Sequence, residues 1–166
     1  TLAIIDGFLV DVAGKLYVIP LEFVDECVEF TEARTHNNQS HFINLRGAVL
    51  PFLKLRDILG ADHGAHQALE SSSSTFLETS EKPAEDNKQN IVIIRHGNNR
   101  SGFVVDQLLG EYQTVIKPLG PIFNQMKLFS GATILGSGEV AIILDVMTLV
   151  ARYAKNTEDR LKTAVG

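Results

Sequence analysis

The stretch Ser130-Gly-Ala-Thr-Ile-Leu-Gly-Ser-Gly-Glu-Val-Ala-Ile-Ile-Leu-Asp-Val-Met-Thr-Leu-Val150 decides the fold of this chain. Two apolar runs flank the short sequence Gly136-Ser-Gly138. Because glycine adopts positive φ without a steric penalty, this pattern predicts two antiparallel strands joined by a tight turn. We therefore expect a β-hairpin here.

A second copy of this hairpin occurs earlier in the chain. Residues 49–59 align without a gap on residues 140–150, at an offset of 91. A further gapless match places residues 17–23 on residues 103–109, at an offset of 86. The two matches occur in the same order, which favours a duplication of one β-rich unit over a chance alignment of apolar strands.

The composition is that of a globular domain in a reducing compartment. The chain has 166 residues, of which 45% are hydrophobic, enough to build a core. Its one cysteine, Cys27, cannot form an internal disulfide, and no secretory signal opens the sequence, so we expect a cytoplasmic protein. The carboxylates beside Cys27 raise a thiol pKa, which disfavours a catalytic thiolate.

The charge pattern argues against two classes of partner. No apolar run approaches the roughly 20 residues that cross a bilayer, so no direct membrane insertion is expected. The net charge is -5, and residues 61–90 contain six acidic and two basic side chains, so the remainder is nearly neutral. With no basic stripe, nucleic-acid binding is not expected.

Most of the chain is predicted to form short strands. The polar segments 31–41 and 61–90 are expected to be a loop and a flexible insertion. Residues 56–59 predict a single helical turn, and residues 147–161 an amphipathic C-terminal helix. Strands are expected at residues 8–12, 15–21, 91–94 and 103–105, and in the two hairpins that turn at residues 46–48 and 136–138. Residues 24–30 favour a further strand, with a short helix as the alternative.

Alternation in the first hairpin predicts apolar side chains on its outer face. Arg46 and Lys54 must face water, so Leu50 and Phe52, which share their parity, are expected to face outward. The same parity in the second hairpin includes Ile143. The alternative is that both faces are covered, as in small barrels, and the sequence leaves this open. The inward set would be Val49, Pro51, Leu53 and Leu55.

The motifs of common active sites are absent from the sequence. Gly136-Ser-Gly138 is followed by Glu139 and Val140, not by the Lys and Ser or Thr of a phosphate-binding loop. No His-Glu-x-x-His, Gly-x-Ser-x-Gly or Cys-x-x-Cys motif occurs. We expect no catalytic residue, cofactor or metal, and infer a protein that works through its surfaces. The histidines of the polar segments, His36, His41, His63 and His66, lack companion ligands at fixed spacing.

A set of segments resembles a known family. As a set they resemble the CheW-like domain of bacterial chemotaxis proteins. The opening Leu2–Val10 is similar to the join between the ATP-binding domain and the C-terminal regulatory domain of the histidine kinase CheA. The resemblance covers nearly the whole chain and departs at residues 61–90. The segments that carry it are Gly131–Val146, Ile43–Pro51, Tyr17–Pro20 and Phe103–Gly110.

The resemblance implies a fold. It is a mostly β fold of two intertwined SH3-like five-stranded barrels, the CheW-like fold, with a C-terminal helix. The expected first barrel covers residues 13–90, with 61–90 as the flexible insertion. The expected second barrel and shared core cover residues 1–12 and 91–147, and the C-terminal helix covers residues 148–166.

The resemblance also implies a function. It predicts a non-catalytic regulatory domain that binds the adaptor CheW and the cytoplasmic tips of chemoreceptors. The domain would adjoin the ATP-binding domain of its own kinase chain, at receptor arrays beneath the inner membrane. A free-standing or hybrid CheW-type adaptor and an unrelated β-barrel binding module are the alternatives. The expected partner-binding residues are Leu50 and Phe52 in the first barrel, Phe103, Leu109 and Ile143 in the second, and Phe8 and Phe129 near a groove between them.

Overall fold

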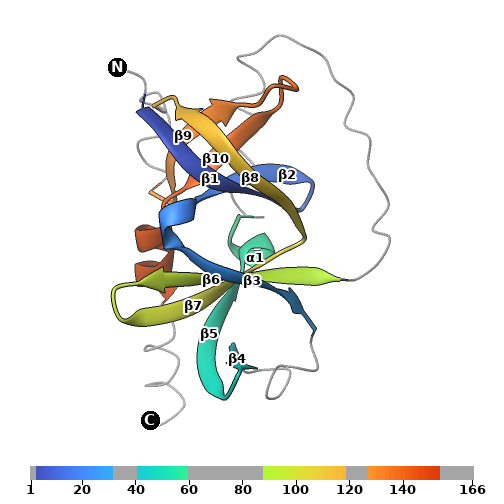
Figure 1. Ribbon diagram of the computed structural model, residues 1–166, viewed down its shortest axis with the longest axis vertical. Helices are drawn as coiled ribbons and strands as arrows, with labels where there is room; N and C mark the ends of the chain where they lie inside the picture. Colours follow the sequence, from blue (N-terminus) through green and yellow to red (C-terminus); the bar gives the residue numbers. More distant parts are fainter. Residues whose placement is uncertain (1–2, 32–40, 60–87, 119–126, 154–166) are drawn as a thin grey trace.

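A computed structural model of the protein describes residues 3–31, 41–59, 88–118 and 127–153. These residues form two five-stranded sheets, one above the other in Figure 1. Sheet 1 has the order β8-β1-β2-β10-β9, and sheet 2 the order β3-β6-β7-β5-β4. The strands are β1 (Ala3–Val12), β2 (Lys15–Pro20), β3 (Val24–Phe30), β4 (Phe42–Leu45), β5 (Ala48–Lys54), β6 (Gln89–His96), β7 (Asn99–Val105), β8 (Gln107–Ile116), β9 (Phe129–Ile134) and β10 (Val140–Leu144).

Short helices follow three of these strands. A 3-10 turn, η1 (Leu21–Phe23), connects β2 to β3, and α1 (Leu55–Leu59) follows β5. Residues 146–153 form the described part of the C-terminal helix after β10. The predicted mostly β fold with a C-terminal helix is confirmed. Most of the expected loop (31–41), most of the expected insertion (61–90) and the helix beyond residue 153 lie outside the described residues, and Gln89 and Asn90 belong to β6 instead of the insertion.

Tight turns with positive φ join the hairpin strands, as the sequence predicted. The β1–β2 turn has Ala13 at φ 54° and Gly14 at φ 79°, and the β4–β5 turn has Arg46 at φ 52° and Gly47 at φ 84°. Two successive residues with positive φ match the right-handed twist of the flanking strands. In the β9–β10 hairpin, Gly138 takes φ 87° within a longer loop.

The two halves of the chain exchange their first hairpins. β1 and β2 pair with β8 and β10, whereas β6 and β7 pair with β3 and β5. Each sheet therefore contains two strands from one half and three from the other. One pairing in each sheet is parallel, β2 with β10 and β7 with β5. The predicted duplication is visible as a pseudo-twofold relation between β1–β5 with α1 and β6–β10 with the C-terminal helix.

This exchange changes the expected barrel boundaries. Those boundaries put residues 15–20 in the first barrel and residues 91–105 in the second. The structure instead places β2 in sheet 1, beside β1 and β10, and places β6 and β7 in sheet 2. The periodicity of a segment identifies a strand, but it does not say which copy of the repeat supplies the neighbouring strand.

The first repeat match is also displaced by two residues. The turn at Ala13–Gly14 corresponds to the turn at Gly97–Asn98, which is an offset of 84 rather than 86. β-Bulges at Asp25 of β3 and Leu109 of β8 agree with the same offset. A two-residue shift preserves the alternation of a strand, so the sequence match could not detect it. The offset of 91 for the second match agrees with the starts of α1 and the C-terminal helix.

One central apolar cluster joins the two sheets. It contains Tyr17 and Ile142 from sheet 1, Leu53 and Phe103 from sheet 2, and Leu149 from the C-terminal helix. A smaller cluster covers the other face of each sheet. Both faces of the central strands are therefore buried, which is why their sequences are continuously apolar. No helix in the described ranges is long and apolar enough to span a membrane.

Leu50 and Phe52 do not face water. They are 7% and 3% exposed and pack with Ile91 in the smaller cluster of sheet 2. Leu53 is buried, as expected, but Val49 is 61% exposed instead of facing inward. The predicted orientation was wrong because both faces of β5 are covered, the alternative that alternation alone could not exclude.

Candidate functional site

The described side chains offer no evident reactive centre. No group of three or more His, Cys, Asp or Glu residues among them could hold a metal ion. Burial, followed by the Glu111 and Glu26 carboxylates, raises the pKa of the half-buried Cys27 thiol. The sequence predicted this direction from neighbouring acids, but Glu111 comes from β8 of the other sheet. The protonated thiol is a poor nucleophile.

The structure buries most of the residues expected to bind partners. Only Leu109, 39% exposed, is among the exposed residues, and Phe8 is half-buried against the central cluster. Phe129 stacks on Tyr17 inside that cluster, with ring centroids 6.4 Å apart, so it does not open onto a groove. The buried members of the expected set are Leu50, Phe52, Phe103, Phe129 and Ile143. Contact with a partner stays a prediction, and Leu109 is its best-placed member.

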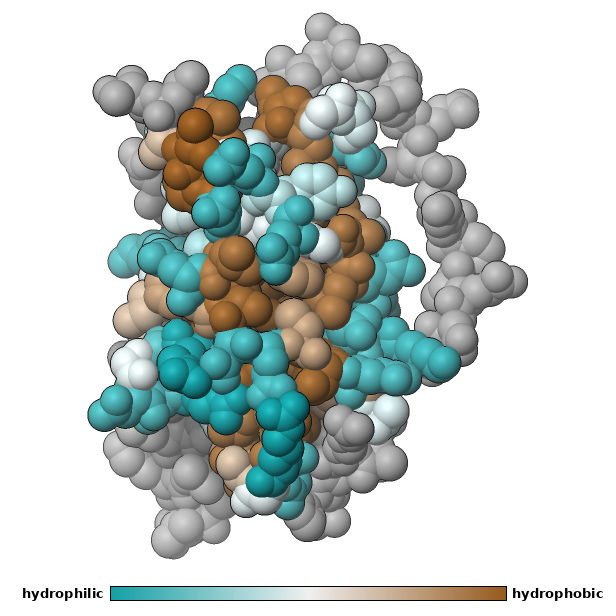
Figure 2. All heavy atoms as spheres, viewed as in Figure 1, coloured by the Kyte–Doolittle hydropathy of each residue, from teal (hydrophilic) through white to brown (hydrophobic). Residues whose placement is uncertain are grey.

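Four of the large exposed apolar side chains belong to sheet 1. They are Ile4 of β1, Leu109 and Tyr112 of β8, and Ile134 of β9, with exposed fractions from 39% to 64%. We call these four residues the sheet-1 apolar set. Figure 2 shows apolar side chains reaching the surface over β1 and β8 and hydrophilic ones gathered over β3, β6 and β7. Outside sheet 1, Val49 and Met147 are the large exposed apolar residues of the described chain.

Equivalent bulges carry different side chains on the two sheets. β8 bulges at Leu109 where it pairs with β1, and β3 bulges at Asp25 where it pairs with β6. A bulge re-aims the side chain of the extra residue. The same backbone feature therefore presents a leucine on sheet 1 and a carboxylate on sheet 2.

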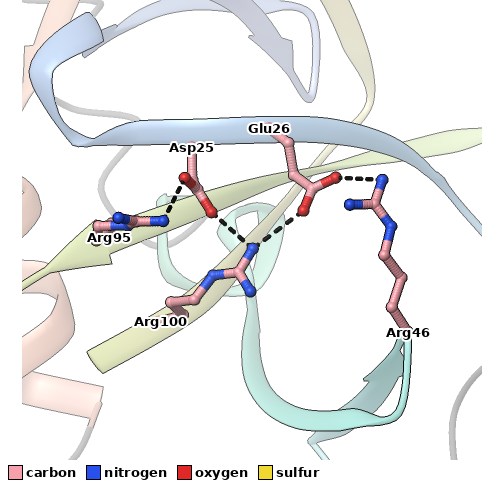
Figure 3. A network of polar contacts seen from close by, with 5 residues as sticks. All are labelled: Asp25, Glu26, Arg46, Arg95 and Arg100. Carbon is pink, nitrogen blue, oxygen red and sulfur yellow. Dashed lines mark hydrogen bonds and ion pairs between the residues drawn. The ribbon is translucent and has the colours of Figure 1, made fainter. Parts of the chain in front are cut away.

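A network of ion pairs surrounds the bulge of sheet 2 (Figure 3). The Nη2 of Arg95 lies 2.9 Å from Asp25 Oδ1, and the Nη2 of Arg100 lies 2.6 Å from Asp25 Oδ2. Arg100 also contacts Glu26 Oε1 at 3.0 Å, and Arg46 contacts Glu26 Oε2 at 3.0 Å. We call these five residues the sheet-2 ionic cluster.

The strand register explains why the cluster forms. Arg95 and Arg100 lie directly opposite each other on β6 and β7, and like charges at such positions destabilise a sheet. The Asp25 carboxylate contacts both guanidinium groups and offsets their repulsion. Arg46 reaches Glu26 from the β4–β5 turn. The cluster thus brings together residues from three strands and a turn that are distant in sequence.

A second polar contact joins the two sheets at Asp106, between β7 and β8. Its Oδ2 accepts hydrogen bonds from the Ala13 backbone N–H at 2.6 Å and from Arg56 Nη2 at 2.9 Å, and its Oδ1 accepts one from Gln89 Nε2 at 3.3 Å. Burial raises the pKa of Asp106, but these three donors outweigh burial and the pKa is lowered. Asp106 is therefore a structural carboxylate that connects the β1–β2 turn, α1 and β6.

Comparisons with known proteins agree with this arrangement. The model of the CheW-like domain matches residues 6–154. The chemotaxis protein CheA of Salmonella typhimurium is 32% identical over 163 residues, which cover 97% of this chain and 21% of that protein. The sensor histidine kinase CheAY of Helicobacter pylori is 33% identical over 147 residues, which cover 88% of this chain and 16% of that protein. The chain thus spans about a fifth or less of the length of these relatives.

A solved structure shares the fold. The scaffolding protein TtCheW from Thermoanaerobacter tengcongensis superposes with a TM-score of 0.61 at 18% identity, over 87% of this chain and 90% of that chain. The CheW-like domain is a non-catalytic scaffold fold. With a family match over 6–154 and CheA proteins aligned along almost its full length, this chain belongs to the CheW-like domain family of chemotaxis proteins.

Proposed function

We propose that this chain is the regulatory domain of a chemotaxis histidine kinase. It binds a CheW-type adaptor and the cytoplasmic tips of chemoreceptors, and it passes receptor state to the ATP-binding domain of its own kinase chain. The site of action is the receptor array beneath the inner membrane. The support is that the CheA protein of Salmonella typhimurium matches 97% of this chain, while the chain spans 21% of that protein.

The observation that carries the proposal is the sheet-1 apolar set. Four large apolar side chains remain exposed on one sheet, although the protein buries both faces of its central strands. Large apolar side chains that stay exposed on a folded domain are typical of interaction sites. Their burial yields roughly 25 cal/mol per Å2, and association costs at least about 4 kcal/mol. A small apolar contact therefore supports reversible binding, which suits a signalling assembly.

A free-standing CheW-type adaptor is the second candidate. The observation in its favour is that the fold of this chain matches 90% of the scaffolding protein TtCheW. The two candidates differ in the domain encoded before Thr1. An ATP-binding domain in the same gene supports the kinase, and its absence supports the adaptor.

The adaptor contact is tested by a matched pair of substitutions. Leu109→Asp removes an apolar contact at the β8 bulge, and Val49→Asp makes the same kind of change at an exposed residue of sheet 2. The bulge backbone accommodates an aspartate in β3, where Asp25 pairs with Arg95 and Arg100, and a thermal melt checks that it does so in β8. We expect isothermal titration calorimetry with the adaptor of the same organism to show at least about tenfold weaker binding for Leu109→Asp, or about 1.4 kcal/mol.

Val49→Asp serves as the control and is expected to bind like the wild type. Thermal melts of both variants should match that of the unmodified domain. Equal adaptor affinities of Leu109→Asp and Val49→Asp would show that the Leu109 region of sheet 1 does not contact the adaptor. A wild-type domain that binds no adaptor and no receptor tip would contradict the proposed function itself.

A further inference from the structure

The fold does not require the sheet-2 ionic cluster. Sheet 1 forms the same bulge with Leu109 where sheet 2 has Asp25. At the offset of 84 residues, Leu16 of β2 corresponds to Arg100 of β7, and Gly110 corresponds to Glu26. The same bulge geometry thus forms once with these ion pairs and once without them, because Asp11, the equivalent of Arg95, lies opposite Leu16 on β2. The charges on sheet 2 need a reason other than the bulge.

Stability gives only a weak reason for the cluster. Ion pairs between exposed side chains contribute about 0–1 kcal/mol, and the arginine side chains here are 31% to 78% exposed. The Nε of Arg100 is buried and has no hydrogen-bond partner, and a buried unpaired donor costs free energy. The cluster therefore adds little net stability to the folded domain.

The cluster holds two arginines ready for a partner. The Arg46 and Arg95 side chains are 78% and 62% exposed, and each forms its ion pair through Nη2. Their remaining guanidinium N–H groups lie outside these pairs, while Glu26 and Asp25 hold the side chains in position. Because the guanidinium geometry matches a carboxylate and fixed side chains lose less entropy on binding, this arrangement favours an anionic partner group.

The net charges of the cluster and of the chain indicate which kind of anion would bind. Three guanidinium groups against two carboxylates leave the cluster with one positive charge, on a chain whose net charge is -5. A polyphosphate backbone has no basic stripe to follow on this chain. Single carboxylates, spaced along a protein segment, suit two separate arginines that flank a pair of acids.

We propose that the sheet-2 ionic cluster binds an acidic segment of a partner protein, whose carboxylates contact Arg46 and Arg95. This surface is chemically distinct from the sheet-1 apolar set on the pseudo-equivalent sheet. A partner that binds the apolar set through apolar side chains does not suit the ionic cluster, and a partner that binds the cluster through carboxylates does not suit the apolar set. The two related sheets thereby distinguish two partner surfaces.

The test uses a peptide probe and the intact chain. A 15N-labelled sample is titrated with a peptide of six glutamates and, separately, with the matching glutamine peptide. We expect saturable shifts of the Arg46 and Arg95 Nε–Hε signals with the glutamate peptide only, and weaker binding as salt is raised. Arg46→Gln and Arg95→Gln are each expected to weaken binding at least about threefold, since each removes one partner charge.

Arg152→Gln is the matched control, because it removes the same charge from an exposed residue of the C-terminal helix. Both cluster variants retain Arg100 against Asp25 and Glu26, so the fold is expected to persist, and a thermal melt checks this. Equal weakening by Arg152→Gln, or the absence of shifts at the cluster, overturns the proposal. The experiment contains no adaptor, so its result is separate from that of the proposed function.

Discussion

At the scale of single residues, Asp106 makes the polar contact that joins the two sheets. Its carboxylate accepts hydrogen bonds from a turn of sheet 1, from α1 and from β6 of sheet 2. Only 18% of the Asp106 side chain is exposed, so water competes little for these hydrogen bonds. Hydrogen bonds to a charged group contribute about 1.5–3 kcal/mol, more than neutral ones. Asp106 is therefore expected to stabilise the arrangement of the two halves.

Asp106→Asn should lower the free energy of unfolding by about 1–3 kcal/mol at pH 7, because the amide cannot pair with Arg56. The pKa of Asp106 is lowered in the folded state, so its contribution is present above the unfolded pKa of about 3.9 and is lost as pH falls through the folded pKa. Urea unfolding measured between neutral and acid pH should therefore show a shallower acid decline for the variant.

Asp11→Asn is the control for this experiment. Burial, aided by the Asp106 charge, raises the pKa of Asp11, although its Oδ1 accepts the Gly14 N–H at 3.0 Å. A raised carboxyl pKa means stability that is lost as pH rises through it, the opposite sign to Asp106. The asparagine keeps an acceptor for Gly14, so Asp11→Asn should not destabilise the domain at pH 7. An equal loss in both variants would contradict the assigned roles.

Burial of single residues was only partly predictable. Alternation correctly placed Leu53 inside, because its side chain enters the central cluster. It failed for Phe52 and Ile143, which enter the smaller clusters on the opposite faces of their sheets. A sheet that is covered on both faces buries residues of both parities, and alternation describes only one buried face. Substitutions of Phe52 or Ile143 therefore act on the core and cannot serve as tests of binding.

At the scale of elements, a glycine and a branched side chain share a diagonal position in each sheet. In sheet 1 the glycine is Gly7 on β1 and the branched residue is Val18 on β2. In sheet 2 the roles are reversed, with Ile91 on β6 and Gly102 on β7. A Cβ at either glycine would meet the branched side chain. The glycine is thus fixed by its cross-strand neighbour, not by its backbone conformation.

Gly102→Ala should destabilise the domain by about 1–3 kcal/mol, the usual cost of overpacking a core. Shortening the neighbour with Ile91→Ala makes room for the added methyl, so the double variant should lose less than the sum of the two single losses. Chemical denaturation of the four proteins in the cycle measures this coupling. Gly136→Ala, where nothing lies near the added Cβ, should leave stability within about 0.5 kcal/mol. Additive losses would contradict the assigned contact.

Elements were easier to predict from the sequence than their register. Glycine-containing turns and apolar runs located the hairpins, because φ preference and burial are local properties. The bulges at Asp25 and Leu109 left no comparable signal, since one extra residue changes pairing without changing composition. The ionic cluster was missed for the same reason. Nothing local indicates that Arg95 and Arg100 face each other across a hairpin and share Asp25.

At the scale of the whole molecule, two related halves form one structure by exchanging hairpins. β1 pairs with β8 from Ala3 and Ile116 to Asp11 and Gln107, and this long pairing crosses between the halves. The duplication could be inferred from the sequence, but the exchange could not, because either copy of a strand satisfies the same apolar pattern. The comparison of Leu109 on sheet 1 with Asp25 on sheet 2, which both proposed partner surfaces use, depends on this exchange.

The exchange is tested most directly by dividing the chain between Ser74 and Thr75, which leaves every described strand intact. NMR spectra are recorded for each fragment alone and for the co-expressed pair. We predict that the pair purifies as a one-to-one complex with the spectrum of the intact domain, because each sheet needs strands from both fragments. Either fragment reproducing its part of that spectrum on its own would contradict the exchange.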